Sequence, residues 1–195
     1  MGALPTPAPE APLFVFGSLL DGDILDIVLG PGAAAPVQRD LATLTGFRRQ
    51  RVNGEPFPML VASDEAVVHG ALLKGLGAEA WARLAFYEGR SYALRVLPVE
   101  AGPERRRCSA HVFFATGRLQ DSGIPWDLDV WRRTEKPLAL LLATELMALY
   151  GQVEPDGPPD AVWDDIKIRC QACLSAVAER DHAHHSRTAA SCSTD

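Results

Sequence analysis

The pattern of apolar and polar residues changes once along the chain, near residue 125. Before that point, apolar residues come in short runs or alternate with polar ones, and glycines and polar turns separate the runs, which is typical of β-strands. After it, apolar residues recur at helical spacing through 136–151 and 160–181. Strands followed by helices, with no visible internal repeat, favour an α+β fold over a doubly wound parallel sheet.

Six runs in the first part predict β-strands beyond an initial apolar strand at 13–16. Turn residues separate the runs, among them Asn53-Gly54 and the acidic pair Asp64-Glu65, so that a hairpin or meander is expected. The six predicted strands are 40–47, 49–52, 57–63, 66–76, 92–101 and 107–116.

Short helices are predicted between these strands. The first covers 24–29, with Asp21 or Asp23 as its N-cap and Gly30 after its last residue. The second covers 77–89 and also ends in glycine. The two ends of the chain, 1–12 and 182–195, lack core-forming residues, and we expect a disordered leader and a disordered tail. The folded part then consists of a strand-rich domain over 13–125 and helices over 126–181 that pack on the same domain.

Composition narrows the classes of function. The chain has 195 residues, of which 47% are hydrophobic, enough for one well-filled core. Its formal charge of −6 argues against nucleic-acid binding. Since no apolar run reaches the roughly 18 residues that cross a bilayer and the N-terminal stretch does not resemble a signal peptide, we expect a cytoplasmic protein without a membrane partner.

The four cysteines show no disulfide framework, and reduced thiols are expected: Cys108, Cys170, Cys173 and Cys192. The pair Cys170-x-x-Cys173, with three histidines downstream at 182, 184 and 185, also admits a zinc or redox interpretation. Because the pair lies inside a helical pattern and no second CxxC exists, we favour packed helix cysteines. We predict neither a metal site nor a cofactor.

The stretch LFVFGSLL, residues 13–20, is the first candidate for chemistry. It admits two interpretations: a strand that ends in an ordinary turn, or a loop in which Gly17 lets the backbone approach a ligand. In the second, the amides of Gly17, Ser18 and Leu19 form a small nest for a carboxylate or another anion. Neither spacing typical of a phosphate-binding loop is present.

The second candidate is the segment Phe86-Tyr87-Glu88-Gly89-Arg90-Ser91-Tyr92, in which a carboxylate sits among aromatic residues. Such packing excludes water from Glu88 and raises its pKa toward neutrality, which suits a general acid/base. The alternative is a solvated glutamate at a helix end.

These features occur together in one known pattern. The order FVFGSLLDGDIL, GFRRQRVNGEPFPMLV, VVHGALLKGL and FYEGRSYALRVLPVE resembles the gamma-glutamylcyclotransferase-like superfamily, also called the AIG2-like fold, over about residues 13–116. The resemblance implies a small mixed β-barrel-like sheet with short helices, to which this chain adds a C-terminal helical extension. Phe16 stands where the family's loop usually has tyrosine.

The resemblance also implies roles for single residues. Loop residues 16–19 would bind the α-amino and α-carboxylate end of a glutamyl group, and Glu88 would act as the general acid/base. Tyr92 would line the pocket or hydrogen-bond the substrate, whereas Arg95 would be structural. The loop residues are Phe16, Gly17, Ser18 and Leu19.

The implied activity is an intramolecular acyl transfer that closes 5-oxoproline and releases an amine or amino acid from a small gamma-glutamyl compound. It requires no cofactor, and the expected assembly is a monomer or a weak homodimer. The alternative is a non-catalytic AIG2-like module that binds a small acidic ligand or a protein partner. Phe16 and the long helical extension motivate that alternative, because a fold alone does not fix an activity.

Overall fold

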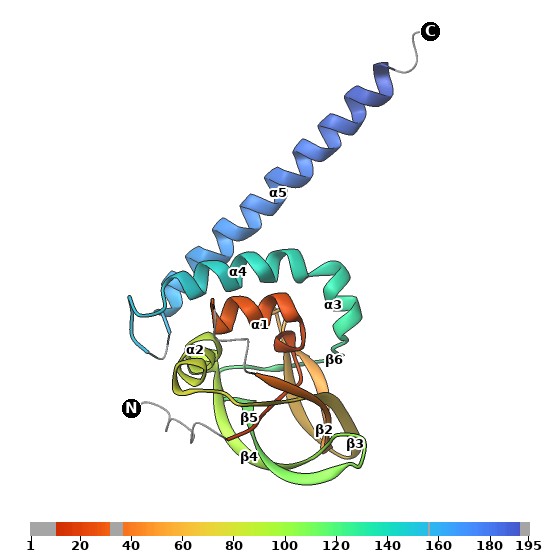
Figure 1. Cartoon of the computed structure of the whole chain (residues 1–195). Helices are drawn as coiled ribbons and strands as arrows, with labels where there is room; N and C mark the ends of the chain where they lie inside the picture. Colours follow the sequence, from red (N-terminus) through yellow and green to blue (C-terminus); the bar gives the residue numbers. More distant parts are fainter. Residues whose placement is uncertain (1–10, 32–36, 156, 192–195) are drawn as a thin grey trace. The chain divides into compact units, whose positions relative to one another are not determined.

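A closed, mixed β-sheet organises the first part of the chain (Figure 1). The computed structural model describes residues 11–31, 37–155 and 157–191. Its described residues form six strands in the order β3-β1-β5-β4-β2-β6, and an additional pairing between β3 and β2 closes the first five into a barrel. β1 runs parallel to β5, and all other pairs are antiparallel. The strands are β1 (Leu13–Val15), β2 (Gln38–Val52), β3 (Pro58–Lys74), β4 (Tyr92–Ala101), β5 (Arg106–Ala115) and β6 (Asp121–Pro125). The predicted α+β, barrel-like fold is confirmed.

The apolar side chains of alternate strand positions meet inside this barrel. The buried cluster contains Phe14, Phe16, Leu44, Leu60, Leu72, Val112 and Phe114 among others. Gly70 on β3 lets β1 approach closely, since a Cβ added there would lie 2.3 Å from the carbonyl oxygen of Val15 and 2.7 Å from the Phe14 ring. The short strand β1 is thereby held in the middle of the fold, and it delivers the loop that follows it to a fixed place.

The two longest strands differ from the prediction. β2 and β3 form one long hairpin, whereas four shorter strands are predicted from the sequence over the same residues. The predicted turn at Asp64-Glu65 is wrong: between the pairs Phe47↔Ala62 and Thr45↔Val67, four residues of β3 lie opposite Gly46 alone. Gly46 has φ +88°. The irregularity bends the hairpin instead of reversing the chain, because a bulge takes up extra residues while the pairing continues. The turn at Asn53-Gly54 is confirmed.

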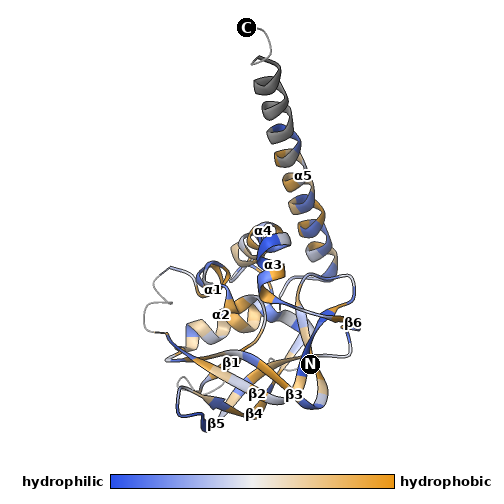
Figure 2. Cartoon of the chain, turned by 90° about the vertical axis from the view of Figure 1, so that its right-hand side faces the viewer, coloured by the Kyte–Doolittle hydropathy of each residue, from blue (hydrophilic) through white to orange (hydrophobic). Residues whose placement is uncertain are grey.

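Short helices gather at one end of the barrel (Figures 1 and 2). Asp21 caps α1 by accepting a hydrogen bond from the Asp23 amide, and Gly30 follows its last residue, which confirms the predicted N-cap and the predicted end. The helix begins at Gly22, two residues before the predicted start. α1 packs against both α2 and α4, and Figure 2 shows apolar residues along α1 and α2. The elements are the 3-10 turn η1 (Ser18–Leu20), α1 (Gly22–Leu29), α2 (Ala78–Glu88), the 3-10 turn η2 (Gly89–Ser91), α3 (Leu128–Thr134) and α4 (Lys136–Ala148).

The chain divides into two compact units between Pro158 and Pro159. The second unit contains one long helix, α5 (Asp160–Ser191). This helix includes residues 182–191, which the sequence pattern assigns to a disordered tail. The segment contains neither glycine nor proline, so no residue in it favours an end to the helix. Of the predicted disordered ends, residues 1–10 and 192–195 lie outside the described residues, and the packing of α5 on the first domain stays a prediction.

Candidate functional site

The loop between β1 and α1 makes a tight turn. The Leu20 amide donates to the Gly17 carbonyl at 2.9 Å, and the Asp21 amide donates to the Ser18 carbonyl at 2.9 Å. The amides of Gly17, Ser18 and Leu19 form no hydrogen bond within the described part of the chain. Gly17 lies against Pro58, where an added Cβ would be 2.8 Å from the proline Cγ. Three backbone donors are thus left in a row on a closely packed loop.

Two arginines of β2 hold the carbonyls at either end of this loop. Arg49 donates from Nη1 to the Phe16 carbonyl at 2.7 Å, and Arg39 donates from Nη2 to the Leu20 carbonyl at 2.6 Å. The Phe16 ring belongs to the barrel core and is only 7% exposed. Because that ring fills core space, phenylalanine meets the packing requirement of the position without a hydroxyl.

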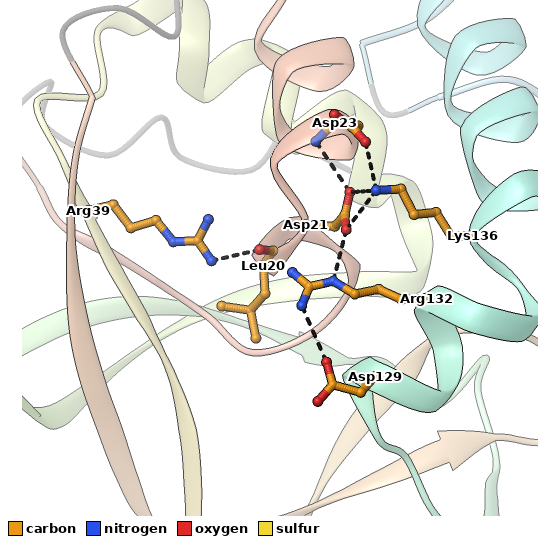
Figure 3. A network of polar contacts seen from close by, with 7 residues as sticks. All are labelled: Leu20, Asp21, Asp23, Arg39, Asp129, Arg132 and Lys136. Atoms are coloured by element: carbon orange, nitrogen blue, oxygen red, sulfur yellow. Dashed lines mark hydrogen bonds and ion pairs between the residues drawn. The ribbon is translucent and has the colours of Figure 1, made fainter.

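Asp21 joins the end of the loop to the helices α3 and α4 through ion pairs in which the aspartate is buried and the two cations are partly exposed (Figure 3). Its Oδ2 accepts from Arg132 Nε at 3.0 Å, and its Oδ1 lies 2.8 Å from Lys136 Nζ. Lys136 also reaches Asp23 at 2.6 Å, and Arg132 reaches the exposed Asp129 at 3.4 Å. We call Asp21, Arg132 and Lys136 the latch.

Asp21 is 2% exposed, and burial on its own raises the pKa of such a carboxyl. Hydrogen bonds and charge from Lys136 and Arg132 outweigh burial, so that the net pKa of Asp21 lies below its ordinary value. A carboxylate at the N-terminus of a helix is favoured further by the helix dipole. The latch is therefore a charged anchor for the loop.

Glu88 is the last residue of α2, and its surroundings differ from those of Asp21. Its side chain is partly exposed, and none of the hydrogen bonds or ion pairs among the described residues involves its carboxylate. Burial, with no compensating partner, raises the pKa of Glu88 from 4.5 to about 8. A carboxyl with such a pKa exchanges its proton near neutral pH, which is what general acid/base chemistry needs.

Two tyrosines lie near Glu88 and use their hydroxyls differently. Tyr92 is buried, and its hydroxyl donates to the Pro58 carbonyl at 2.8 Å. The Tyr87 hydroxyl lies 3.4 Å from Ser18 Oγ, which links the end of α2 to the loop. Burial, followed by the charge of Glu88, raises the pKa of Tyr92 well above its ordinary value. Burial also raises the pKa of Tyr87 to about 12, against the hydrogen bond from Ser18 and with a contribution from Glu88. Both tyrosines therefore stay neutral at physiological pH.

The segment Pro56-Phe57-Pro58 forms another side of the same region. Trp126 donates from Nε1 to the Pro56 carbonyl at 2.9 Å, and the Phe57 ring lies 6.3 Å from the Tyr92 ring, edge to face. Pro58 in turn touches both Gly17 and Tyr92. The loop, the Pro58 segment and the end of α2 are thus connected by direct contacts.

The structure brings together some of the predicted residues and adds others. Ser18 lies beside the segment that carries Glu88, whereas Tyr92 has its hydroxyl committed to Pro58. Arg95 packs over the Phe114 ring at 4.8 Å, on the strand that was expected to use it structurally. Sequence reasoning missed Tyr87 and the latch. Tyr87 could have been found from its position next to Glu88 in the sequence. No local feature of the sequence indicates the latch.

No group of three or more histidine, cysteine, aspartate or glutamate side chains that could hold a metal ion occurs in the part of the chain that the structure describes. None of the described cysteines forms a disulfide: Cys108 lies on β5, and Cys170 and Cys173 lie within α5. Among the described residues, no helix is both long and apolar enough to cross a membrane.

Comparisons with known proteins bear on the family and the fold. A sequence model of the family described as "Gamma-glutamyl cyclotransferase, AIG2-like" matches residues 13–133. AIG2-like protein B of Arabidopsis thaliana is 28% identical over 139 residues, which cover 69% of this chain and 77% of the relative. AIG2-like protein A of the same plant is 26% identical over 151 residues, 76% of this chain and 88% of the relative.

Solved structures share the fold at low identity. A protein of Arabidopsis thaliana solved in solution superposes with a TM-score of 0.52 at 23% identity, covering 76% of this chain and 96% of the other. A structure described as gamma-glutamyl cyclotransferase superposes with a TM-score of 0.50 at 13% identity, covering 81% of this chain and 86% of the other.

Proposed function

The chain belongs to the gamma-glutamyl cyclotransferase, AIG2-like family, and on that premise we propose that it acts in the cytoplasm as a cyclotransferase on small gamma-glutamyl compounds. Glu88 is the general acid/base of this proposal. The observation that carries it is the unpaired carboxyl of Glu88, whose pKa is raised to about 8 and whose neighbour in the chain, Tyr87, contacts Ser18 in a loop that keeps three free amides.

The reaction needs no protein nucleophile. The substrate's α-ammonium loses a proton to the Glu88 carboxylate, and the free amine attacks its own γ-carbonyl carbon. A carbon–nitrogen bond forms within the glutamyl group, the bond to the leaving nitrogen breaks, and Glu88 returns the proton to that nitrogen. The attacking nitrogen carries two protons after the attack and passes the second one to the departing amine, which leaves as an ammonium ion. The products are 5-oxoproline and an amine or amino acid, and one carboxyl performs two of these proton transfers in turn.

Positioning of the substrate is expected to supply much of the rest of the rate enhancement. A flexible glutamyl chain must be held folded with its amine against its carbonyl, and such preorganisation lowers a barrier by up to about 7 to 11 kcal/mol in favourable cases. In the proposal, the amides of Gly17, Ser18 and Leu19 bind the α-carboxylate end. The latch and the two β2 arginines supply the rigidity that this binding requires, because each fixes a different point of the loop.

The test is release of 5-oxoproline from a panel of gamma-glutamyl amines and peptides. Glu88→Gln keeps the size of the side chain but removes the exchangeable proton, and we expect a loss of about 10²- to 10⁴-fold in kcat. Glu65→Gln changes an exposed glutamate of β3 and serves as the matched control with wild-type rates. Equal rates for Glu88→Gln and wild type across the panel would contradict the assignment. Binding of 5-oxoproline or glutamate without any turnover would instead support a non-catalytic ligand-binding module.

A further inference from the structure

Two hydroxyl groups near Glu88 have no strong partner of their own. The distance of 3.4 Å between Tyr87 Oη and Ser18 Oγ is well beyond the roughly 2.7 to 2.8 Å at which hydroxyl–hydroxyl hydrogen bonds usually form. The two groups therefore lie side by side without being firmly bonded. Neither takes part in another hydrogen bond among the described residues.

Tyr92 provides the internal contrast. Its hydroxyl donates to the Pro58 carbonyl at 2.8 Å, an ordinary hydrogen bond in a buried place. Tyr92 is thus occupied in holding the Pro58 segment, whereas Tyr87 keeps a donor that can turn toward a ligand. The charge of Glu88 acts on the hydroxyls of both tyrosines, so its carboxyl lies near each of them.

We propose that Tyr87 is a substrate-positioning residue whose hydroxyl, together with Ser18 Oγ, donates hydrogen bonds to the α-carboxylate of the glutamyl group. The inference rests on the proposed function and deepens it by naming the group that is recognised. If the α-ammonium lies at Glu88, the α-carboxylate on the same carbon atom must lie within a few ångströms of it. The next donors in that region are the two hydroxyls and the free loop amides.

The consequence is selectivity for compounds with a free α-carboxylate. A hydrogen bond to a charged acceptor is stronger than one to a neutral acceptor, so a neutral α-carboxamide gains less from the same hydroxyls. The tyrosine also supplies a hydroxyl to this region in a chain whose loop carries Phe16. Because the Tyr87 hydroxyl remains protonated, it can donate to an anion over the whole physiological pH range.

The experiment uses the full chain with Glu88→Gln, so that gamma-glutamyl compounds stay intact during a calorimetric titration. Two probes are compared: gamma-glutamyl-alanine and the same dipeptide with its glutamyl α-carboxylate converted to the carboxamide. We expect the carboxylate form to bind about 10- to 100-fold more tightly. Adding Tyr87→Phe should reduce this ratio to about 3 or less, and adding Ser18→Ala should reduce it in the same direction.

Adding Tyr150→Phe is the matched control and should leave the ratio unchanged, since that hydroxyl lies 3.3 Å from Glu79 at the other end of α2. The ratio compares two ligands on one protein, so a partly unfolded variant shifts both affinities and leaves the ratio intact. An unchanged ratio with Tyr87→Phe, or no binding of either probe to Glu88→Gln, would overturn the subsite. If the wild-type protein releases 5-oxoproline but Tyr87→Phe leaves the affinity ratio of the two probes unchanged, the subsite alone is rejected. If the affinity ratio behaves as predicted but the wild-type protein releases no 5-oxoproline, the cyclotransferase activity alone is rejected.

Discussion

Asp21 and Glu88 are both acidic residues at helix ends, yet their environments have opposite effects on the pKa of the carboxyl group. Asp21 begins α1 and is neutralised by Arg132 and Lys136. Glu88 ends α2 and makes no ion pair within the described residues. The pKa of Asp21 falls below its ordinary value, while burial raises that of Glu88 to about 8. The helix dipole acts in the same directions, since it favours an anion at the N-terminus and disfavours one at the C-terminus.

Under the proposed function, the difference separates a structural carboxylate, Asp21, from a reactive one, Glu88. A paired anion keeps its charge and anchors what it touches, whereas an unpaired, partly buried carboxyl changes charge near neutral pH. Such a group costs the folded state stability at high pH, which proteins commonly accept at functional sites. Each of the following variants tests one side of this contrast.

The largest effect on stability is expected for Asp21→Asn. Asparagine still accepts a hydrogen bond as an N-cap, so the change removes the charge that pairs with Arg132 and Lys136. We expect the free energy of unfolding to fall by about 2 to 4 kcal/mol in urea at pH 7. Asp129→Asn is the matched control, because this aspartate contacts the same Arg132 but its side chain is 74% exposed. It should cost less than about 0.5 kcal/mol, and equal losses for the two variants would contradict a special role of the latch.

Stability should respond to Glu88→Gln in the opposite sense. Folded Glu88 holds its proton up to a pH of about 8, whereas the unfolded chain releases it near 4.5, so the wild type loses stability as the pH rises between these values. Glutamine carries no such penalty. The measured quantity is the free energy of unfolding of the variant minus that of wild type, from urea unfolding at both pH values. We expect this difference to be about 1 to 3 kcal/mol larger at pH 9 than at pH 4.5. A difference that does not depend on pH would indicate that Glu88 titrates alike in both states.

Much of the fold could be predicted from the sequence, but contacts between distant residues could not. Alternating apolar residues identified β4 and β5, and the turn at Asn53-Gly54 identified where β2 and β3 meet, although each of these strands was predicted as two shorter ones. β6 escaped prediction because its sequence, DSGIP, has no alternation and contains a glycine and a proline. It pairs with β2 through Gln50 and Val52.

The candidate site divides in the same way. The loop at 16–19 and Glu88 were predicted from local motifs, and whether they act together stays a prediction. The latch joins Asp21 to residues 111 and 115 positions further along the chain. On their helices Arg132 and Lys136 read as ordinary solvent-facing cations, since neither spacing nor composition indicates a buried partner. Tyr87 was visible beside Glu88, but its proximity to Ser18 depends on how α2 meets the loop.

The smallest effect concerns the pH dependence of turnover. The value of kcat/KM should rise with pH and level off above about 8, because free Glu88 must be ionised to accept a proton. The pKa seen in the pH profile of kcat should be lower by about one unit than that seen in kcat/KM, since the bound substrate's ammonium stabilises the carboxylate. Initial rates of 5-oxoproline release between pH 5 and 9 measure both, and a profile without any ionisation in this range would argue against Glu88 as the base.

The contrast between the two carboxyls is tested most directly by titrating them in one sample. Carboxyl ¹³C NMR of the labelled full chain follows both groups, with Glu88→Gln and Asp21→Asn providing the resonance assignments. We expect the Glu88 signal to move with a pKa of about 8, and the Asp21 signal to move only at acidic pH, with a pKa below the ordinary 3.8. A Glu88 pKa near 4.5 would contradict this expectation.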